Sequence, residues 1–292
     1  MKLSIAAKIN LVFILIFALG FVVAGIVTNA LLKESAREET IQSARLLLGS
    51  ASAVRNYTSK QIVPLLRAQL ESQFLPQSVP SYSAVENFNI VSQNYPNFSY
   101  KEATLNPTNP RDRATDWEAD VVNKLRSDTN LKEYVGERDT PTGRSLFVAR
   151  PLQIKDPSCL QCHSTPDAAP IKMLDVYGPN NGFGWKLNEI VGAQIISVPM
   201  TVPLERADAI FKTFMLSLLG VFVFLFLALN VMIHVFITRR IIALSSLADQ
   251  VSMGQFDAAE FNTKGSDELS ALAQSFGRMR TSLARAMKML DD

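Results

Sequence analysis

The chemistry-bearing residues of this chain are its two cysteines and a neighbouring histidine, in the run Cys159-Leu160-Gln161-Cys162-His163. Two thiols three positions apart can each form a thioether with one vinyl group of the same porphyrin. The adjacent imidazole can then bind the porphyrin iron axially. The motif therefore predicts one covalent c-type haem (haem c), held by Cys159 and Cys162 with His163 as an iron ligand.

Two other readings of the cysteine pair are weaker. A structural zinc site needs four Cys or His ligands, but the other histidine of the chain, His234, falls in a long apolar run. A redox-active disulfide usually lies between a strand and the start of a long helix. Pro166 and Pro170 follow the motif closely and disfavour such a helix. Haem attachment remains the favoured reading.

The second axial position of the iron has several candidates. Met173 or Met200 could supply a thioether, which raises the potential of a haem, although core packing is the commoner role for each methionine taken alone. Tyr57 is another possible neighbour, and an open position would admit a diatomic gas. Arg150 and Lys172 could pair with the haem propionates.

Two long uncharged stretches point to a membrane protein. The chain has 292 residues, of which 48% are hydrophobic and only 19% charged, with a net charge of +2 that gives no reason to expect nucleic-acid binding. Residues 9–32 and 213–238 each exceed the roughly 20 apolar residues that span a bilayer. Buried core helices rarely stay apolar on every face for so long. The first stretch is longer than a signal peptide's apolar region and is read as an uncleaved anchor.

The flanking charges predict the orientation. Lys2 and Lys8 precede the first span, and Arg239 and Arg240 follow the second. Positive flanks stay in the cytoplasm, so residues 1–8 and 239–292 are expected inside. Residues 33–212 would then form a domain outside the inner membrane, which in a Gram-negative bacterium means the periplasm.

The pattern of the outer domain predicts an α+β fold with one sheet and helices on one side of it. A long helix interrupted at Pro64 should come first, and a Pro- and Asn-rich stretch from residue 76 to 110 should be mostly turns and loops. The expected strands and second helix have the following ranges: strands at 98–103, 145–150 and 191–198, and a short helix at 117–124.

The cytoplasmic tail predicts two helices and a paired coil. The first helix should end at Gly254, and a connector over residues 255–264 has Phe256 and Phe261 as apolar anchors. In the second helix apolar side chains recur at heptad spacing: Leu269, Leu272, Phe276, Met279, Leu283, Ala286 and Leu290. One helix cannot bury such a seam, so the tail is expected to form a homodimer.

The tail resembles a HAMP domain, a parallel four-helix signalling coil made by two chains. The matching residues are Gly254 with Phe256, then Asp267-Glu268-Leu269, then Phe276 and Met279. HAMP domains often carry a proline just after the membrane, where this chain has Arg239-Arg240.

The outer domain resembles the Tll0287-like haem domain, also called DUF3365, over most of residues 45–200. The resemblance implies a PAS-like sheet that carries a c-type haem in membrane sensors. Some members use a cysteine as second axial ligand, and this chain has no spare cysteine for that role. The matching stretches are Val54-Arg55-Asn56-Tyr57-Thr58, Tyr100-Lys101-Glu102-Ala103, Asn106-Pro107-Thr108-Asn109-Pro110, Trp117-Glu118, Ala149-Arg150-Pro151, Cys159 to Ser164, Ala169-Pro170, Tyr177-Gly178, Gly182-Phe183-Gly184-Trp185 and Gly192-Ala193-Gln194.

This layout predicts a membrane-bound haem sensor of redox state or a diatomic gas, and not an enzyme. Its expected partners are membrane lipid, a second copy through the HAMP coil, and a separate cytoplasmic kinase or other output protein. The alternative is a membrane-anchored c-type cytochrome that exchanges electrons with a redox partner. A paired cytoplasmic coil is unnecessary for electron transfer and therefore favours sensing.

Overall fold

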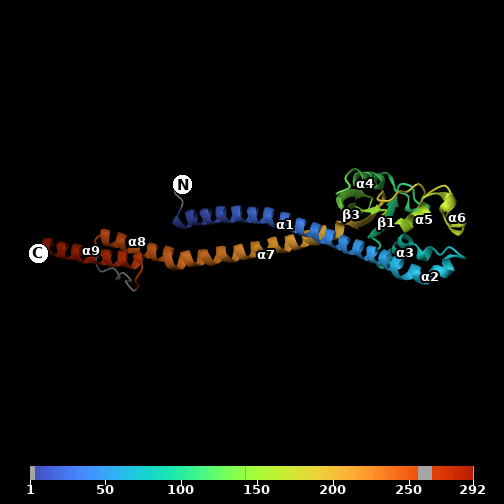
Figure 1. Ribbon diagram of the computed structural model, residues 1–292. Coiled ribbons are helices and arrows are strands. Elements are labelled where there is room, and N and C mark those ends of the chain that lie inside the picture. Colours follow the sequence, from blue (N-terminus) through green and yellow to red (C-terminus); the bar gives the residue numbers. More distant parts are fainter. Residues whose placement is uncertain (1–3, 142, 256–264, 292) are drawn as a thin grey trace. The chain divides into compact units, whose positions relative to one another are not determined.

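The computed structural model describes residues 4–141, 143–255 and 265–291. It divides into two compact units, Asn29–Ile210 and the combination of Met1–Thr28 with Phe211–Asp292. Each unit is described by itself below, with the element labels of Figure 1.

The first unit is built on a four-stranded antiparallel sheet. Its strands are β1 (Ser99–Thr104), β2 (Tyr134–Thr140), β3 (Gly143–Gln153) and β4 (Ile190–Pro199), in the order β1-β4-β3-β2. The three predicted strands are confirmed as β1, β3 and β4. The edge strand β2 was not predicted, because its sequence is mostly polar and contains a glycine.

One face of the sheet is covered by α1 (Ile5–Tyr57) and α3 (Pro80–Asn94). Helical spacing puts Ile41, Ala44, Leu48 and Ala51 on one side of α1. They pack in a buried cluster whose sheet members come from alternate positions of the strands: Tyr100, Leu146, Val148, Ile196 and Val198. This cluster fixes the outer part of α1 against the strands.

The opposite face carries α4 (Asp116–Ser127), so the prediction of helices on one side only was wrong. Thr115 and Glu118 form a capping box that starts this helix. Its apolar side chains Val121, Val122 and Leu125 cover the second set of alternating strand residues: Ala103, Phe147, Ala149, Ala193 and Ile195. Strands with small and apolar residues on both faces can bury both, and this sheet does.

The prediction of turns and loops over residues 76–110 was wrong for α3. Pro80 occupies the start of that helix, where a missing N–H costs no hydrogen bond. Pro64 has the expected disruptive effect, because α1 gives way to a wide π turn, η1 (Thr58–Ile62), before α2 (Val63–Leu70).

Short elements connect β3 to β4. They are the 3-10 turn η4 (Pro157–Cys159), the single helical turn α5 (Leu160–His163), the turn η5 (Pro166–Ala168) and α6 (Ile171–Tyr177). We call residues 156–185 the attachment segment, since it contains both cysteines and His163. Figure 1 shows α5 and α6 at the end of the sheet unit where α2 also lies.

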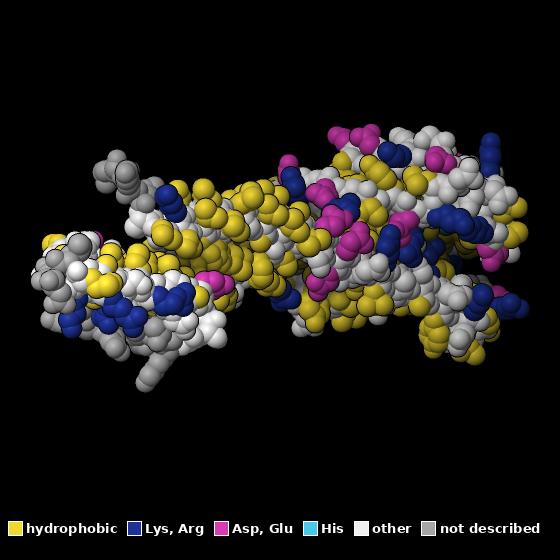
Figure 2. All heavy atoms as spheres, turned by 90° about the vertical axis from the view of Figure 1, so that its left-hand side faces the viewer, with side chains coloured by type: hydrophobic (Ala, Val, Ile, Leu, Met, Phe, Trp, Pro, Cys, Tyr) yellow, Lys and Arg dark blue, Asp and Glu magenta, His cyan; other side chains and the backbone are white. Residues whose placement is uncertain are grey.

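The second unit contains two helices long and apolar enough to cross a membrane. The first is the initial part of α1, which runs unbroken past residue 32, and the second is α7 (Thr201–Ile233). Few of their side chains are buried, and Figure 2 shows a broad hydrophobic region on the surface of the molecule. Asn10 and Asn230 join these helices by a hydrogen bond of 2.7 Å, and Phe17 packs edge-on against Phe222.

A π turn, η6 (His234–Thr238), leads from α7 into α8 (Arg239–Ser252), and α9 (Glu268–Asp291) follows. Gly254 ends the first of these helices with a φ of 82°. Leu272, Met279 and Leu283 of the heptad remain 45%, 47% and 45% exposed. One chain therefore leaves part of the seam open. Phe256 and Phe261 lie outside the described residues.

Candidate haem-attachment site

The two cysteines lie on one short helical turn. Asp156 starts this turn, because its side chain accepts a hydrogen bond of 2.9 Å from the Ser158 amide and its carbonyl accepts one of 3.1 Å from the Cys159 amide. Helical residues three apart point to the same side, so Cys159 and Cys162 face one space. Both are free thiols, and burial raises the pKa of each above its ordinary value.

This geometry disfavours the redox-disulfide reading. A thioredoxin-like cysteine is activated by a lowered pKa at the start of a long helix. Here α5 contains only 4 residues, and the pKa of both thiols is raised by burial. A raised pKa leaves little thiolate at neutral pH, and the thiolate is the form that carries out disulfide exchange.

His163 is oriented by the loop that follows it. Its Nδ1 lies 2.8 Å from the carbonyl oxygen of Gly182, and its ring stacks on Trp185 with centroids 3.9 Å apart and planes 14° apart. A proton on Nδ1, donated to that carbonyl, leaves Nε2 with a free lone pair. Burial lowers the pKa of His163, although the hydrogen bond to Gly182 opposes it. The imidazole is therefore held in the neutral form that binds iron.

The loop at Gly182 is itself fixed in place. The amides of Gly184 and Trp185 donate to the carbonyls of Ser164 and His163 at 2.9 and 3.2 Å. The Asn106 side chain accepts from the Gly182 amide and donates to the Phe183 carbonyl, each at 3.2 Å. These bonds hold the Gly182 carbonyl in position to accept the hydrogen bond from the His163 ring. Gly182 and Trp185 matched the family pattern in the sequence, but nothing in the sequence linked them to His163.

Gly182 has two reasons to be a glycine. Its φ is 85°, a backbone conformation that side chains disfavour. A Cβ at this position would also collide with Thr108, whose Cα would lie at 2.9 Å. Thr108 in turn has its hydroxyl 3.4 Å from Nδ1 of His163. The tight approach of these two loops requires the missing side chain.

An arginine approaches the attachment site from α1. Arg55 forms an ion pair with Glu102, a carboxylate that is only 1% exposed. The Tyr100 hydroxyl donates to the same carboxylate at 2.6 Å, and the Gln194 side chain donates to that hydroxyl at 2.9 Å. The charge of Arg55 lowers the pKa of Cys159 and partly offsets burial. Arg55 is a charged neighbour of the attachment site that the sequence reading did not single out.

The structure separates the two methionine candidates. Met173 is buried on α6, within the attachment segment. Met200 is buried in the core cluster that also contains Leu48 and Ile196, just beyond β4. Tyr57, at the end of α1, is 53% exposed. Met200 therefore belongs to the sheet core, whereas Met173 lies in the same segment as His163.

The two suggested propionate partners have protein partners already. Arg150 pairs with Glu133 at 3.0 Å and Lys172 pairs with Asp175 at 3.3 Å. Burial acts to raise the pKa of Glu133, but hydrogen bonds from Arg45 and Arg150 lower it further than burial raises it. Arg150 thus has a structural role in anchoring β3.

Two family models match parts of this chain. The family model described as Tll0287-like matches residues 33–199, and the model described as HAMP domain matches residues 228–285. Among solved structures, the crystal structure of the cyanobacterial heme-protein Tll0287 is similar, at 13% identity with a TM-score of 0.43. The match covers 55% of this chain and 95% of the Tll0287 chain. No curated protein matches.

The haem-family match covers more than half of the chain and includes the whole sheet and the attachment segment. The HAMP match includes α8 and most of α9. The chain therefore belongs to the Tll0287-like family, and it joins that haem-protein domain to two candidate membrane helices and a HAMP domain.

Proposed function

We propose that this protein is a membrane sensor whose outer domain carries one haem c, bound covalently by Cys159 and Cys162 and axially by His163. A single observation carries this proposal: Nδ1 of His163 is committed to the Gly182 carbonyl at 2.8 Å, which leaves Nε2 for a metal. When bound, the haem supplies an iron that changes oxidation state or takes a diatomic ligand.

The proposed boundaries follow the charges and the helices. Residues 9–32 and 213–238 cross the bacterial inner membrane, and residues 33–212 face the periplasm. Residues 1–8 and the HAMP domain, residues 239–292, face the cytoplasm. The clustering of positive charge at both inner flanks supports this orientation.

The route of the signal is suggested by connectivity. The attachment segment ends at Trp185, shortly before β4 begins at Ile190, and β4 leads through Met200 directly into α7. A shift of β4 would therefore reach the second span without passing through a loop. The half-exposed heptad residues of α9 support pairing with a second copy. A separate kinase or other output protein then reads the paired coil.

The sixth position of the iron is proposed to be open or held by Met173. Met173 lies in the attachment segment, whereas Met200 contributes to the sheet core. An open position favours sensing of a gas, and a methionine ligand favours sensing of redox state.

Absorption spectra of the full chain test the haem proposal. The chain is produced in membranes together with haem-attachment machinery and measured oxidised, reduced, and reduced under carbon monoxide. We expect a c-type spectrum that survives denaturation in the wild type. A changed reduced spectrum in Met173→Ala indicates a methionine ligand, and an unchanged one indicates an open position; Met200→Ala serves as the buried-methionine control. A wild type without covalent haem contradicts the proposal.

The alternative, a membrane-anchored cytochrome, makes a different prediction for the coil. Leu272→Cys places a thiol on the half-exposed seam of α9. Cross-linking by a bismaleimide is then compared between oxidised and ascorbate-reduced protein. A sensor should show a different cross-linking rate in the two states. Equal rates, with and without carbon monoxide, would favour electron transfer.

A further inference from the structure

A hollow of about 600 Å³ lies on the sheet face that α4 only partly covers. This volume is in the range of pockets that hold small molecules. Its lining includes residues of β1, β2, β3 and β4 and the first residue of α7, and it does not include Cys159, Cys162 or His163. The hollow is therefore separate from the attachment site.

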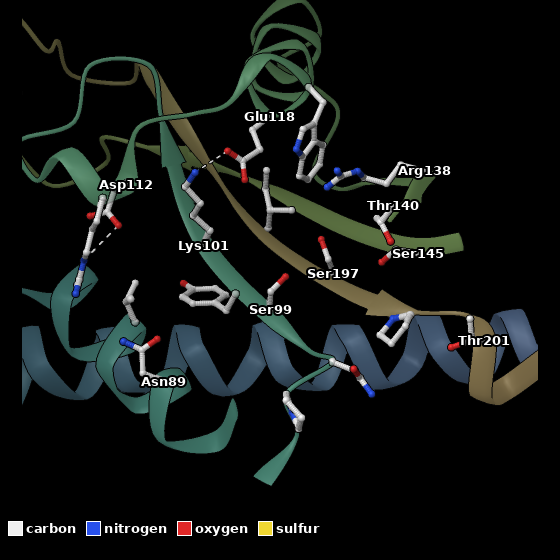
Figure 3. A pocket seen from close by; sticks show the side chains of 18 residues that line it. Asn89, Ser99, Lys101, Asp112, Glu118, Arg138, Thr140, Ser145, Ser197 and Thr201 are labelled. Atoms are coloured by element: carbon white, nitrogen blue, oxygen red, sulfur yellow. Dashed lines mark hydrogen bonds and ion pairs between the residues drawn. The ribbon is translucent and has the colours of Figure 1, made fainter. Parts of the chain in front are cut away.

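The floor of the hollow is polar because the side chains on this face of the sheet change from apolar to polar along the strands. Beneath α4 this face presents apolar residues such as Phe147 and Ile195. Beyond the end of α4 the same face presents Ser99, Ser145 and Ser197, of which Ser99 and Ser197 are register partners. Figure 3 shows these three side chains on one side of the sheet. Small hydroxyl side chains leave both the space and the hydrogen-bonding capacity for a polar guest.

The walls contain one arginine without a carboxylate partner. Lys101 is neutralised by Glu118 at 2.7 Å, and Arg111 pairs with Glu86 at 2.5 Å. Arg138 lies opposite Ser145 in the register, and its guanidinium stacks 4.1 Å over the ring of Trp117. Within the described part of the chain no acidic side chain forms an ion pair with Arg138.

We propose that this hollow binds a small polar organic molecule through a carboxylate, which accepts hydrogen bonds from the guanidinium of Arg138. An arginine held flat against an aromatic ring presents its donors in the fork that matches a carboxylate. The hydroxyls of Ser99 and Ser197 then bind the rest of the molecule, whereas the Ser145 hydroxyl already donates to the Val198 carbonyl at 3.2 Å. A single uncommitted cation fits a monovalent carboxylate better than a phosphate dianion.

The position of the hollow gives such a ligand a route to the membrane. Pro199 and Thr201 line it, and these residues join β4 to α7. A ligand there would contact the junction that the proposed haem signal also uses. The protein would then receive two inputs, and the second would not need the haem.

Calorimetric titration of the full chain in detergent tests the site. The probes are the monocarboxylates acetate, lactate and pyruvate, with lactamide as an uncharged match for lactate and inorganic phosphate as a competitor. We expect one saturable site for at least one carboxylate and no binding of lactamide. Failure of all three carboxylates, or tighter binding of phosphate, would overturn the proposal.

Variants locate the binding. Arg138→Gln should weaken binding by about tenfold or more, since it removes a charge-assisted pair of hydrogen bonds. Arg144→Gln is the control, because Arg144 is exposed and pairs only distantly, at 3.6 Å, with Glu137. Ser197→Leu should block the floor without touching the arginine. Equal binding by the wild type and both hollow variants would show that the site lies elsewhere.

A haem-free variant separates this inference from the proposed function. The double variant Cys159→Ser and Cys162→Ser cannot hold covalent haem, and it should bind the carboxylate as the wild type does. Loss of binding in this variant, with the sheet intact, would show that the hollow depends on the haem and would refute an independent site.

Discussion

The strands of the sheet are held on both faces by buried apolar clusters, whereas the attachment segment is held by hydrogen bonds and by two ring contacts, His163 with Trp185 and Tyr177 with Phe74. Neither cluster contains a residue of the attachment segment. The segment buries Ala169 and Met173, but its helical elements are short, and the longest of them, α6, has 7 residues. The comparison shows that the side chains of the candidate site need little regular structure of their own when a rigid sheet supports both ends of their segment.

The largest expected effect separates cofactor from fold. Cys159→Ser with Cys162→Ser should abolish covalent haem entirely and leave the sheet intact, since the sheet's clusters do not include these residues. Haem staining of a denaturing gel measures the first effect and far-ultraviolet circular dichroism the second. A chain that unfolds without its cysteines would show that the sheet depends on the haem.

A substitution in the core of the sheet domain tests the other region. Leu48 is fully buried between α1 and the strands, and Leu48→Ala should lower the free energy of unfolding by about 3 kcal/mol. Leu46, two residues away on the same helix, is 76% exposed. Leu46→Ala is the control and should change stability by less than about 0.5 kcal/mol. Urea unfolding of the detergent-solubilised chain measures both. Equal effects would contradict the assigned core.

A third change tests the close contact between the loops that contain Gly182 and Thr108. Gly182→Ala should destabilise the His163 loop by about 2 kcal/mol, because a Cβ meets Thr108 at a positive φ. Gly184→Ala is a matched control, with a φ of 80° and no atom near its Cβ. The haem absorption spectrum should change in the first variant more than in the second. Thr108→Ala should partly restore the Gly182 variant, and no restoration would place the strain elsewhere.

The smallest expected effect is a dependence of the unit's folding stability on pH. Burial raises the pKa of Asp112 from 3.8 to about 6. The folded state then binds a proton more tightly than the unfolded state, so stability should fall by about 1–2 kcal/mol as pH rises from about 4 to 6. It should stay constant above that range. Asp112→Asn should flatten this part of the profile, measured by urea unfolding at each pH. An unchanged slope in the variant would assign the effect to another group.

Predictions from the sequence were reliable for elements that a single local property, such as periodicity or length, determines. The two apolar stretches, the heptad of α9, and the strands β1, β3 and β4 follow from periodicity and length alone. Two of the differences have separate causes. Residues 76–110 were predicted to be mostly turns and loops, but Pro80 begins a helix there, because the first position of a helix needs no N–H. The second apolar face of the strands was not recognised, because its cover comes from α4, which lies elsewhere in the chain.

The sequence by itself determined which groups can attach a haem, because Cys159, Cys162 and His163 lie within five consecutive positions and their chemistry is intrinsic. Only the tertiary structure decided what orients them. Gly182 and Trp185 reach His163 from about twenty residues away, and Arg55 and Glu102 meet from different elements. Likewise, Arg138 and three serines share a hollow because strand register places them there. Such contacts depend on the path of loops and on strand pairing, which no local pattern of residue types records.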